Sequence, residues 1–270
     1  MAARNEKLEQ TASKSRLHRQ LFVMVPVVAA ALAGCASDDT IDPATCDAPE
    51  RYRVNEVRWP ADHEQARALG FDLNGDETVD NQLGALVVSL DNYFVDPFDL
   101  SDAATHHMVS VAWDLEVQRC AGDRARVTIG GGEALVGTVS DGVFTARGDA
   151  GELPVAALFA PTDELVDAGW RTSARSAVRL AVIGDRLVGD VGMAPAQADV
   201  SSAVVTAMTA FIDSRTQLQP ELLEVFDRDG DGTIVENEVS QNTLTRSMLA
   251  PDLTDVAALS MGFGIVATRR

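Results

Sequence analysis

The chain has 270 residues, with 22 Lys+Arg against 41 Asp+Glu and a net charge of −19. This excess of acid argues against nucleic acid or an anionic membrane surface as a main partner, because both require a basic footprint. Hydrophobic residues make up 46% and charged residues 23%, which excludes a disordered acidic tail and indicates a folded body.

The first 34 residues have the features of an export signal. Residues 1–20 carry five basic and two acidic residues, and 14 uncharged residues follow at 21–34. That stretch is shorter than the roughly 20 residues of a transmembrane helix, but it fits the hydrophobic region of a secretory signal. It ends Leu32-Ala33-Gly34-Cys35. This ending resembles the lipobox of bacterial lipoproteins, in which the cysteine is lipidated and becomes the mature N-terminus.

The lipobox predicts an exported protein that meets the membrane only through lipid on Cys35. Ala36 and Ser37 follow the cysteine. By resemblance to Gram-negative lipoproteins, the lack of Asp there favours the outer membrane. The alternative is an ordinary signal peptide followed by a chance cysteine. Removal of residues 1–34 leaves a net charge near −22, and the small, polar residues 35–50 are typical of a tether.

Two further cysteines, Cys46 and Cys120, remain once Cys35 is assigned to lipid. An export signal implies an oxidising compartment, so we expect these two to form a disulfide. The bond would fasten the end of the tether to the folded body. The alternative is a pair of free thiols.

The region 51–195 is typical of a β-sheet. Residues 109–117 alternate between apolar and small or polar side chains, with Trp113 on the apolar side, which predicts a half-buried strand. Shorter strands are predicted at 52–59, 126–129, 134–139, 143–147, 155–159, 177–183 and 186–191. Many short strands separated by Gly- and Asp-containing turns favour a mainly β fold, an antiparallel β-sandwich or jelly roll.

The region 196–270 changes to a helical period. Apolar residues at 204, 208, 211 and 212 fall on one face of a predicted helix, and a second helix is predicted at 220–226. We therefore expect a helical, EF-hand-like segment here, followed by a C-terminal strand.

Residues 227–238, between the predicted helices, resemble an EF-hand calcium loop. The expected ligands are Asp227, Asp229 and Asp231 at positions 1, 3 and 5, the Thr233 carbonyl at position 7 and Glu238 at position 12. Gly232 occupies position 6, where the chain must turn sharply. Oxygen ligands without imidazole or thiolate indicate Ca²⁺ rather than Zn²⁺. The alternative is a solvated acidic turn.

Residues 72–80 resemble the calcium repeats of dockerin and thrombospondin type. The candidate ligands are Asp72, Asn74, Asp76 and Asp80, at positions 1, 3, 5 and 9. Glu77 replaces glycine at position 6, and Leu83 at position 12 cannot bind a cation. A residue other than glycine is strained at positive φ. The alternative is an acidic loop that caps the following segment, 82–90.

The whole pattern resembles a group of bacterial outer-membrane lipoproteins for which no activity is known. The resemblance is carried by the lipobox, the segment FDLNGDETVDNQLG, the β-rich body and the tail LAPDLTDVAALSMGFGIVA. It covers most of the chain after Cys35 and implies fold and location rather than an activity.

The sequence favours a calcium-binding, membrane-anchored lipoprotein that is not an enzyme and in which Ca²⁺ is structural. It contains no GxSxG, HExxH or P-loop motif. The alternative is a secreted carbohydrate-binding or carbohydrate-hydrolysing protein. A cleft with two carboxylates beside an exposed Trp59, Trp113 or Trp170 would favour it. A third possibility is a surface adhesion or assembly protein, which an exposed apolar patch would favour. A protein or polysaccharide partner is not identified by the sequence.

Overall fold

The computed structural model describes residues 41–93, 100–159, 169–214 and 219–270. The predicted signal peptide 1–34 and the lipidation site Cys35 lie outside these residues. Contacts divide the chain into two units, Met1–Asp38 and Asp39–Arg270. The second unit contains every described element and its own core, so we expect it to fold by itself.

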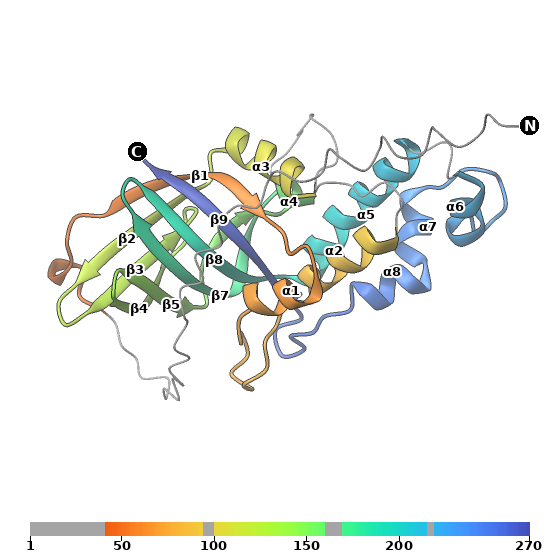
Figure 1. The fold of residues 1–270 in the computed structure, drawn as a ribbon. Coiled ribbons are helices and arrows are strands. Elements are labelled where there is room, and N and C mark those ends of the chain that lie inside the picture. The colour runs from red at the N-terminus through yellow and green to blue at the C-terminus, as the bar shows by residue number, and fades with distance from the viewer. Residues whose placement is uncertain (1–40, 94–99, 160–168, 215–218) are drawn as a thin grey trace, which may run out of the picture. The chain divides into compact units, whose positions relative to one another are not determined.

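The fold is mainly β, with one large antiparallel sheet and several helices (Figure 1). The strands are β1 (Glu50–Arg58), β2 (Asp114–Cys120), β3 (Arg124–Ile129), β4 (Ala134–Ser140), β5 (Val143–Gly148), β6 (Glu152–Pro154), β7 (Trp170–Ile183), β8 (Arg186–Pro195) and β9 (Met261–Arg269). Their order in the sheet is β5-β4-β3-β2-β1-β9-β8-β7-β6. The mainly β class predicted from the sequence is confirmed.

An additional pairing closes the sheet on itself. Strand β5 pairs with β7 as well as with β4, so eight of the strands form a continuous ring of antiparallel pairs. Because each described strand is joined to this one sheet, the pairing does not confirm a sandwich or jelly roll. Side chains fill the interior of such a closed sheet when it has about eight strands.

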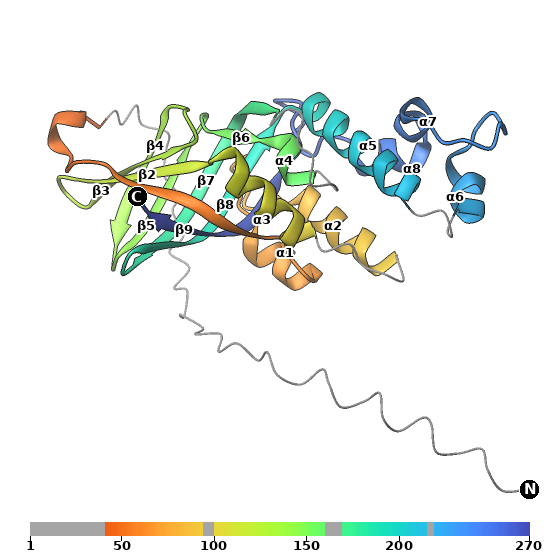
Figure 2. The same ribbon diagram turned by 90° about the horizontal axis from the view of Figure 1, so that it is seen from above.

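The helices are α1 (His63–Leu69), α2 (Gln82–Tyr93), α3 (Leu100–Val111), α4 (Val155–Phe159), α5 (Gln197–Ser214), α6 (Gln219–Phe226), α7 (Glu236–Gln241) and α8 (Thr243–Met248). A short 3₁₀ helix, η1, spans Pro43–Thr45. Both views place α5 to α8 beyond one end of the strands (Figures 1 and 2). Among the described helices, none is both long enough and apolar enough to cross a membrane.

Two predicted strands are wrong in part or in full. Residues up to Val111 belong to α3, and β2 begins only at Asp114, after Ala112 turns the chain at a φ of 60°. The predicted strand at 155–159 is the helix α4. A short apolar run fits either a strand or a helix. Residues 109–111 continue the helix α3, which buries Ala104 and Met108.

The main core extends through the sheet interior and under the helices as a large cluster of buried side chains, and a small second cluster consists of Ala194, Leu253 and Ala258. Trp113 is fully buried, and its ring lies 6.1 Å from that of Phe263 in β9. Strand β9 lies between β1 and β8, so the last residues of the chain complete the sheet begun by the first strands.

Candidate metal centre

The loop at 227–238 joins α6 to α7 and is anchored at three points. Phe226, Ile234 and Val239 are buried in the core cluster together with residues of α5. The side chain of Asn242, just after α7, donates a hydrogen bond to the Val225 carbonyl in α6 at 2.8 Å. The packing therefore fixes both ends of the loop, while its acidic side chains lie at the surface.

The first three acidic residues of this loop gather around one point. Asp227, Asp229 and Asp231 each offer a carboxylate oxygen, and these oxygens all lie within 4.8 Å of one another. Among the described residues, no other three acidic, histidine or cysteine side chains are gathered this closely. Asp227 also accepts hydrogen bonds from the N–H groups of Gly230, at 2.7 Å, and Gly232, at 2.9 Å. These bonds wrap the backbone around the first carboxylate.

Glu238 folds back across the loop from the first turn of α7. Its Oε1 accepts a hydrogen bond from the Arg228 N–H at 2.8 Å, and its Oε2 accepts one from the Val235 N–H at 3.2 Å. The second contact also caps α7, since Glu238 is its third residue. One carboxylate therefore links the beginning of the loop to its end.

Thr233 contacts the cluster through its donors. Its N–H and its hydroxyl both donate to Asp231 Oδ1, at 2.8 and 2.6 Å. These two hydrogen bonds, first that of the hydroxyl and then that of the N–H, lower the pKa of Asp231 below its ordinary value. Asp231 therefore stays ionised in the folded protein to lower pH than a free aspartate.

The loop at 72–80 repeats this arrangement closely. Asp72 accepts hydrogen bonds from the N–H groups of Gly75, at 2.6 Å, and Glu77, at 3.1 Å. Asn74 accepts from the N–H of Asp76 at 2.9 Å, and Asp76 accepts from that of Thr78 at 2.8 Å. The same positions, 1, 3 and 5, therefore accept the backbone bonds in both loops.

The backbone conformation of the 227–238 loop is also repeated in the 72–80 loop. Gly75 and Gly230, both at position 4, have φ values of 81° and 76°. At position 6, Glu77 has a φ of 67° and Gly232 one of 85°. The departure at position 6 therefore does not change the path of the chain, but it places a glutamate in the left-handed region that favours glycine.

Asp80 takes over the contact that Glu238 makes in the other loop. Its Oδ2 accepts a hydrogen bond from the Leu73 N–H at 2.7 Å, and Leu73 is the residue at position 2, as Arg228 is. Burial, followed by the charges of Asp252 and Asp76, raises the pKa of Asp80. The shorter loop is thus closed at position 9 instead of position 12.

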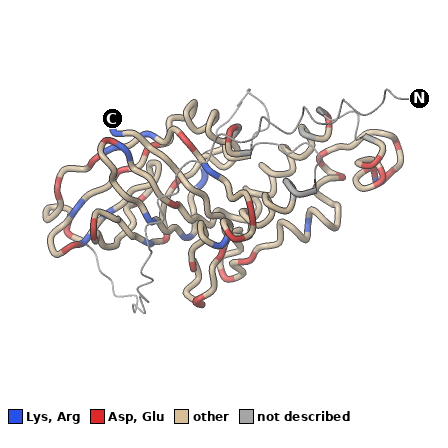
Figure 3. The backbone as a smooth tube through the Cα atoms, in the orientation of Figure 1, with Lys and Arg blue, Asp and Glu red and all other residues tan. Residues whose placement is uncertain are grey.

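The two loops project from different parts of the Asp39–Arg270 unit (Figure 1). The 72–80 loop contacts the sheet at its beginning, where Arg147 of β5 donates to the Asp72 carbonyl at 3.0 Å. The tube in Figure 3 shows acidic residues gathered at both loops, whereas most of the arginines follow the strands. The loops are therefore two separate candidate centres.

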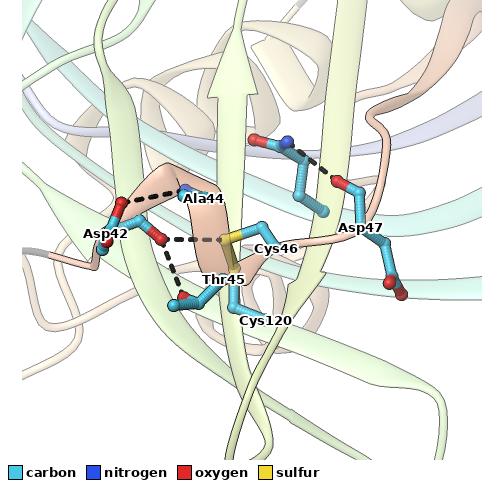
Figure 4. Close-up of a disulfide and its surroundings, with 7 residues drawn as sticks. Asp42, Ala44, Thr45, Cys46, Asp47 and Cys120 are labelled. Atoms are coloured by element: carbon cyan, nitrogen blue, oxygen red, sulfur yellow. Dashed lines mark hydrogen bonds between the residues drawn. A yellow bond between two sulfur atoms is a disulfide. The ribbon is translucent and has the colours of Figure 1, made fainter.

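The cysteines lie at disulfide-bond distance. The sulfur atoms of Cys46 and Cys120 are 1.99 Å apart (Figure 4). Ala121 donates to the Thr45 carbonyl at 3.1 Å, and Asp47 donates to that of Arg119 at 2.8 Å. The segment before β1 is thus tied to the end of β2 by a covalent bond and by hydrogen bonds on both sides of it.

Two residues that support the 72–80 loop, Asn81 and Ser260, were not predicted, because no motif in the sequence marks them. Asn81 is buried and forms hydrogen bonds to α1 and β9, and Ser260 forms hydrogen bonds to Asp252 and to the start of α2.

No protein-family model, curated protein or solved structure matches the chain. Its function therefore has to be inferred from its own residues.

Proposed function

We propose that this protein is an exported lipoprotein, anchored to the outer membrane through lipid on Cys35, that binds Ca²⁺ in a structural role and is not an enzyme. The observation that supports calcium most directly is the convergence of Asp227, Asp229 and Asp231 within 4.8 Å, with Glu238 folded across the same loop. This arrangement supports the proposal of an EF-hand-type loop.

The donor set favours a hard divalent cation. Its side-chain donors are carboxylate oxygens, and Ca²⁺ takes six to eight oxygen ligands, whereas Zn²⁺ prefers imidazole and thiolate. Three carboxylates this close repel one another unless a cation or protons offset their charge. Calcium would remove that repulsion and use the free lone pairs of the oxygens that already accept backbone N–H groups.

A structural role fits the position of the loop. It connects α6 to α7, and Thr206 of α5 donates to Glu236 of α7 at 2.7 Å. A bound ion would hold these helices in place against the core. Extracellular calcium modules bind with dissociation constants of about 10⁻⁴–10⁻³ M. When free Ca²⁺ is at ten times the dissociation constant, one such site adds about 1.4 kcal/mol to the free energy of unfolding.

The 72–80 loop is proposed as a second calcium site. Asp72, Asn74 and Asp76 accept the same backbone hydrogen bonds as their counterparts at 227–231, and Asp80 supplies a fourth oxygen side chain. This loop follows α1 and precedes α2, so calcium there would fasten both helices to the sheet.

Thermal unfolding of residues 39–270 in Ca²⁺ and in EDTA tests the proposal. We expect Ca²⁺ to raise the midpoint and Glu238→Gln to remove part of the rise, because the amide keeps the shape of the side chain and loses its charge. Glu224→Gln is the control, since this exposed residue of α6 carries the same charge outside the loop. A wild-type midpoint that is identical in Ca²⁺ and EDTA would show that both loops are solvated turns.

The anchor is tested in cells that express the full chain. We expect wild-type protein in the membrane fraction and Cys35→Ser protein in the soluble fraction, because the variant has no thiol to carry lipid. Equal partition of the two proteins would contradict the lipoprotein assignment without affecting the calcium proposal.

A further inference from the structure

An open cleft lies on the surface of the Asp39–Arg270 unit, and none of its lining residues belongs to either acidic loop. Its volume is about 410 Å³, within the range of small-molecule sites. The lining residues are Ala112, Asp114, Gly130, Gly131, Glu152 and Trp170. They come from the turn between α3 and β2, the start of β2, the turn after β3, the strand β6 and the start of β7.

One wall of the cleft is the indole of Trp170. This side chain is 39% exposed, whereas Trp59 and Trp113 are buried. Among the large apolar side chains that the described part of the chain exposes, Trp170 is the only aromatic one. An exposed indole provides a flat apolar face and one N–H donor, which suits a ligand that is apolar on one side and polar at its edge.

Another part of the lining is built around Glu152. Trp113 Nε1 donates to the Glu152 carbonyl at 2.9 Å, and the Gly131 N–H donates to the Glu152 carboxylate at 3.3 Å. A Cβ atom at Gly130 would lie 2.6 Å from the Glu152 carbonyl oxygen. The turn can therefore approach Glu152 this closely only because it consists of glycines, and the carboxylate is held in place.

The charges around the cleft balance. Asp114 forms ion pairs with Arg53, through both of its oxygens, and with Arg270, whose Nη1 lies 2.9 Å from Asp114 Oδ2. Two guanidinium groups thus accompany the two carboxylates of the cleft, although the whole chain is strongly acidic. This balance disfavours a cationic ligand and leaves hydrogen-bond acceptors beside an aromatic face.

We propose that this cleft binds a neutral saccharide, with a sugar ring stacked on Trp170 and hydroxyl groups donating to Glu152. The ligand class follows from the three features together, an indole face, fixed oxygen acceptors and no net charge. The site is one for binding and not for hydrolysis, since both Asp114 oxygens are held by guanidinium groups. It does not depend on the calcium loops, which share no residue with it.

Isothermal titration calorimetry of residues 39–270 tests the site, in Ca²⁺ throughout. The probes are three neutral trisaccharides that differ in linkage and in N-acetylation, namely maltotriose, cellotriose and triacetylchitotriose, together with choline as a cationic probe. We expect at least one trisaccharide to bind saturably and choline not to bind. Trp170→Ala should weaken that binding at least about tenfold, and Trp170→Phe should restore part of it.

Ile183→Ala is the matched control, because Ile183 is exposed at the other end of the same strand, β7. It should bind the trisaccharide like the wild type. Thermal unfolding of each variant separates a lost ligand contact from a lost fold, since Trp170 is a surface residue. The proposal is overturned if none of the three trisaccharides binds, if choline alone binds, or if Trp170→Ala binds as well as Ile183→Ala.

Discussion

The side chain of Asn81 pairs with the backbone of Gly262 as a neighbouring strand would. Its Nδ2 donates to the Gly262 carbonyl at 3.1 Å, and its Oδ1 accepts from the Gly262 N–H at 2.7 Å. The same amide also donates to the Ala66 carbonyl at 2.8 Å and accepts from the Gly84 N–H at 3.0 Å. One buried side chain therefore joins α1, α2 and β9 directly after the 72–80 loop.

Replacing Asn81 by alanine should lower the free energy of unfolding by about 2–3 kcal/mol, because it leaves buried backbone groups without partners. Asn55→Ala is the control. Asn55 is exposed, and its side chain donates to the Thr268 hydroxyl of β9, so its loss should cost less than about 1 kcal/mol. Urea unfolding of both variants measures the difference. Equal costs would mean that the Asn81 contacts add no more than a surface bond.

The disulfide should contribute to stability through the unfolded chain. Cys46 and Cys120 are 74 residues apart, and a loop of that length corresponds to about 4 kcal/mol in the chain-entropy account. The double variant Cys46→Ala/Cys120→Ala should therefore unfold at a lower urea concentration than the wild type. Addition of a reductant should destabilise the wild type and leave the double variant unchanged. A reductant effect on both proteins would point to a cause other than this bond.

Position 6 of the two loops should respond to substitution in opposite directions: adding a side chain at Gly232 should lower the free energy of unfolding, and removing the side chain of Glu77 should raise it. Gly232 has a φ of 85°, and a Cβ atom added there would meet no heavy atom within 4 Å. Gly232→Ala therefore adds backbone strain of about 1–2 kcal/mol without a clash. Glu77 already bears this strain at a φ of 67°, so Glu77→Gly should stabilise the protein by up to about 1 kcal/mol. Urea unfolding in EDTA measures both, and effects of the same sign would contradict the conformational explanation.

The Asp114 ion pairs should make stability depend on pH. Burial raises the pKa of Asp114, but the hydrogen bonds and charges of Arg53 and Arg270 outweigh it and hold the pKa below its ordinary value. A depressed carboxyl pKa stabilises the folded state above the unfolded-state pKa, at about pH 4, and this stability is lost as pH falls through the folded-state value. Asp114→Asn should therefore destabilise the protein at pH 7 by about 1 kcal/mol.

The difference between Asp114→Asn and wild type should shrink in urea titrations at about pH 3. Asp185→Asn is a suitable comparison, since among the described residues the Asp185 side chain forms no close ion pair and interacts with Arg269 only at longer range. A difference for Asp114→Asn that is constant from pH 7 to pH 3 would mean that its effect comes from shape and not from charge.

The sequence predicted the strands better than their partners. Alternation marks which residues of a strand face the core, and the predicted strand at 52–59 nearly coincides with β1. Closure of the sheet depends on β5 meeting β7, across a connection that contains β6 and α4. Nothing in the local pattern of either strand encodes that meeting, because it results from the twist and coiling of the whole sheet.

The acidic loops were predictable because their ligands lie close together along the chain. Alternate acidic residues and a glycine in fixed register predicted that the carboxylates of 227–231 would gather, because such spacing along one short loop requires little of the rest of the fold. The closing role of Asp80 was not predictable, since it depends on how Phe71 and Asp80 bridge across the loop. The sequence offered Trp170 only as one of three tryptophans that could lie beside carboxylates. Its place next to Glu152 was hidden, because the two residues lie on different strands and β6 pairs with the start of β7 only in the folded protein.

The last prediction separates the two proposed calcium sites. Each should raise the melting midpoint of residues 39–270 by roughly 3–5 °C at a tenfold excess of Ca²⁺ over its dissociation constant. Glu238→Gln should remove one increment, and Asp80→Asn should remove the other. In EDTA, Asp80→Asn should cost little, because the amide oxygen can still accept from Leu73 and the repulsion with Asp252 is relieved. The double variant should melt at the same temperature in Ca²⁺ and EDTA. If Glu238→Gln alone abolishes the response, the 72–80 loop is an acidic cap on α2 and not a calcium site.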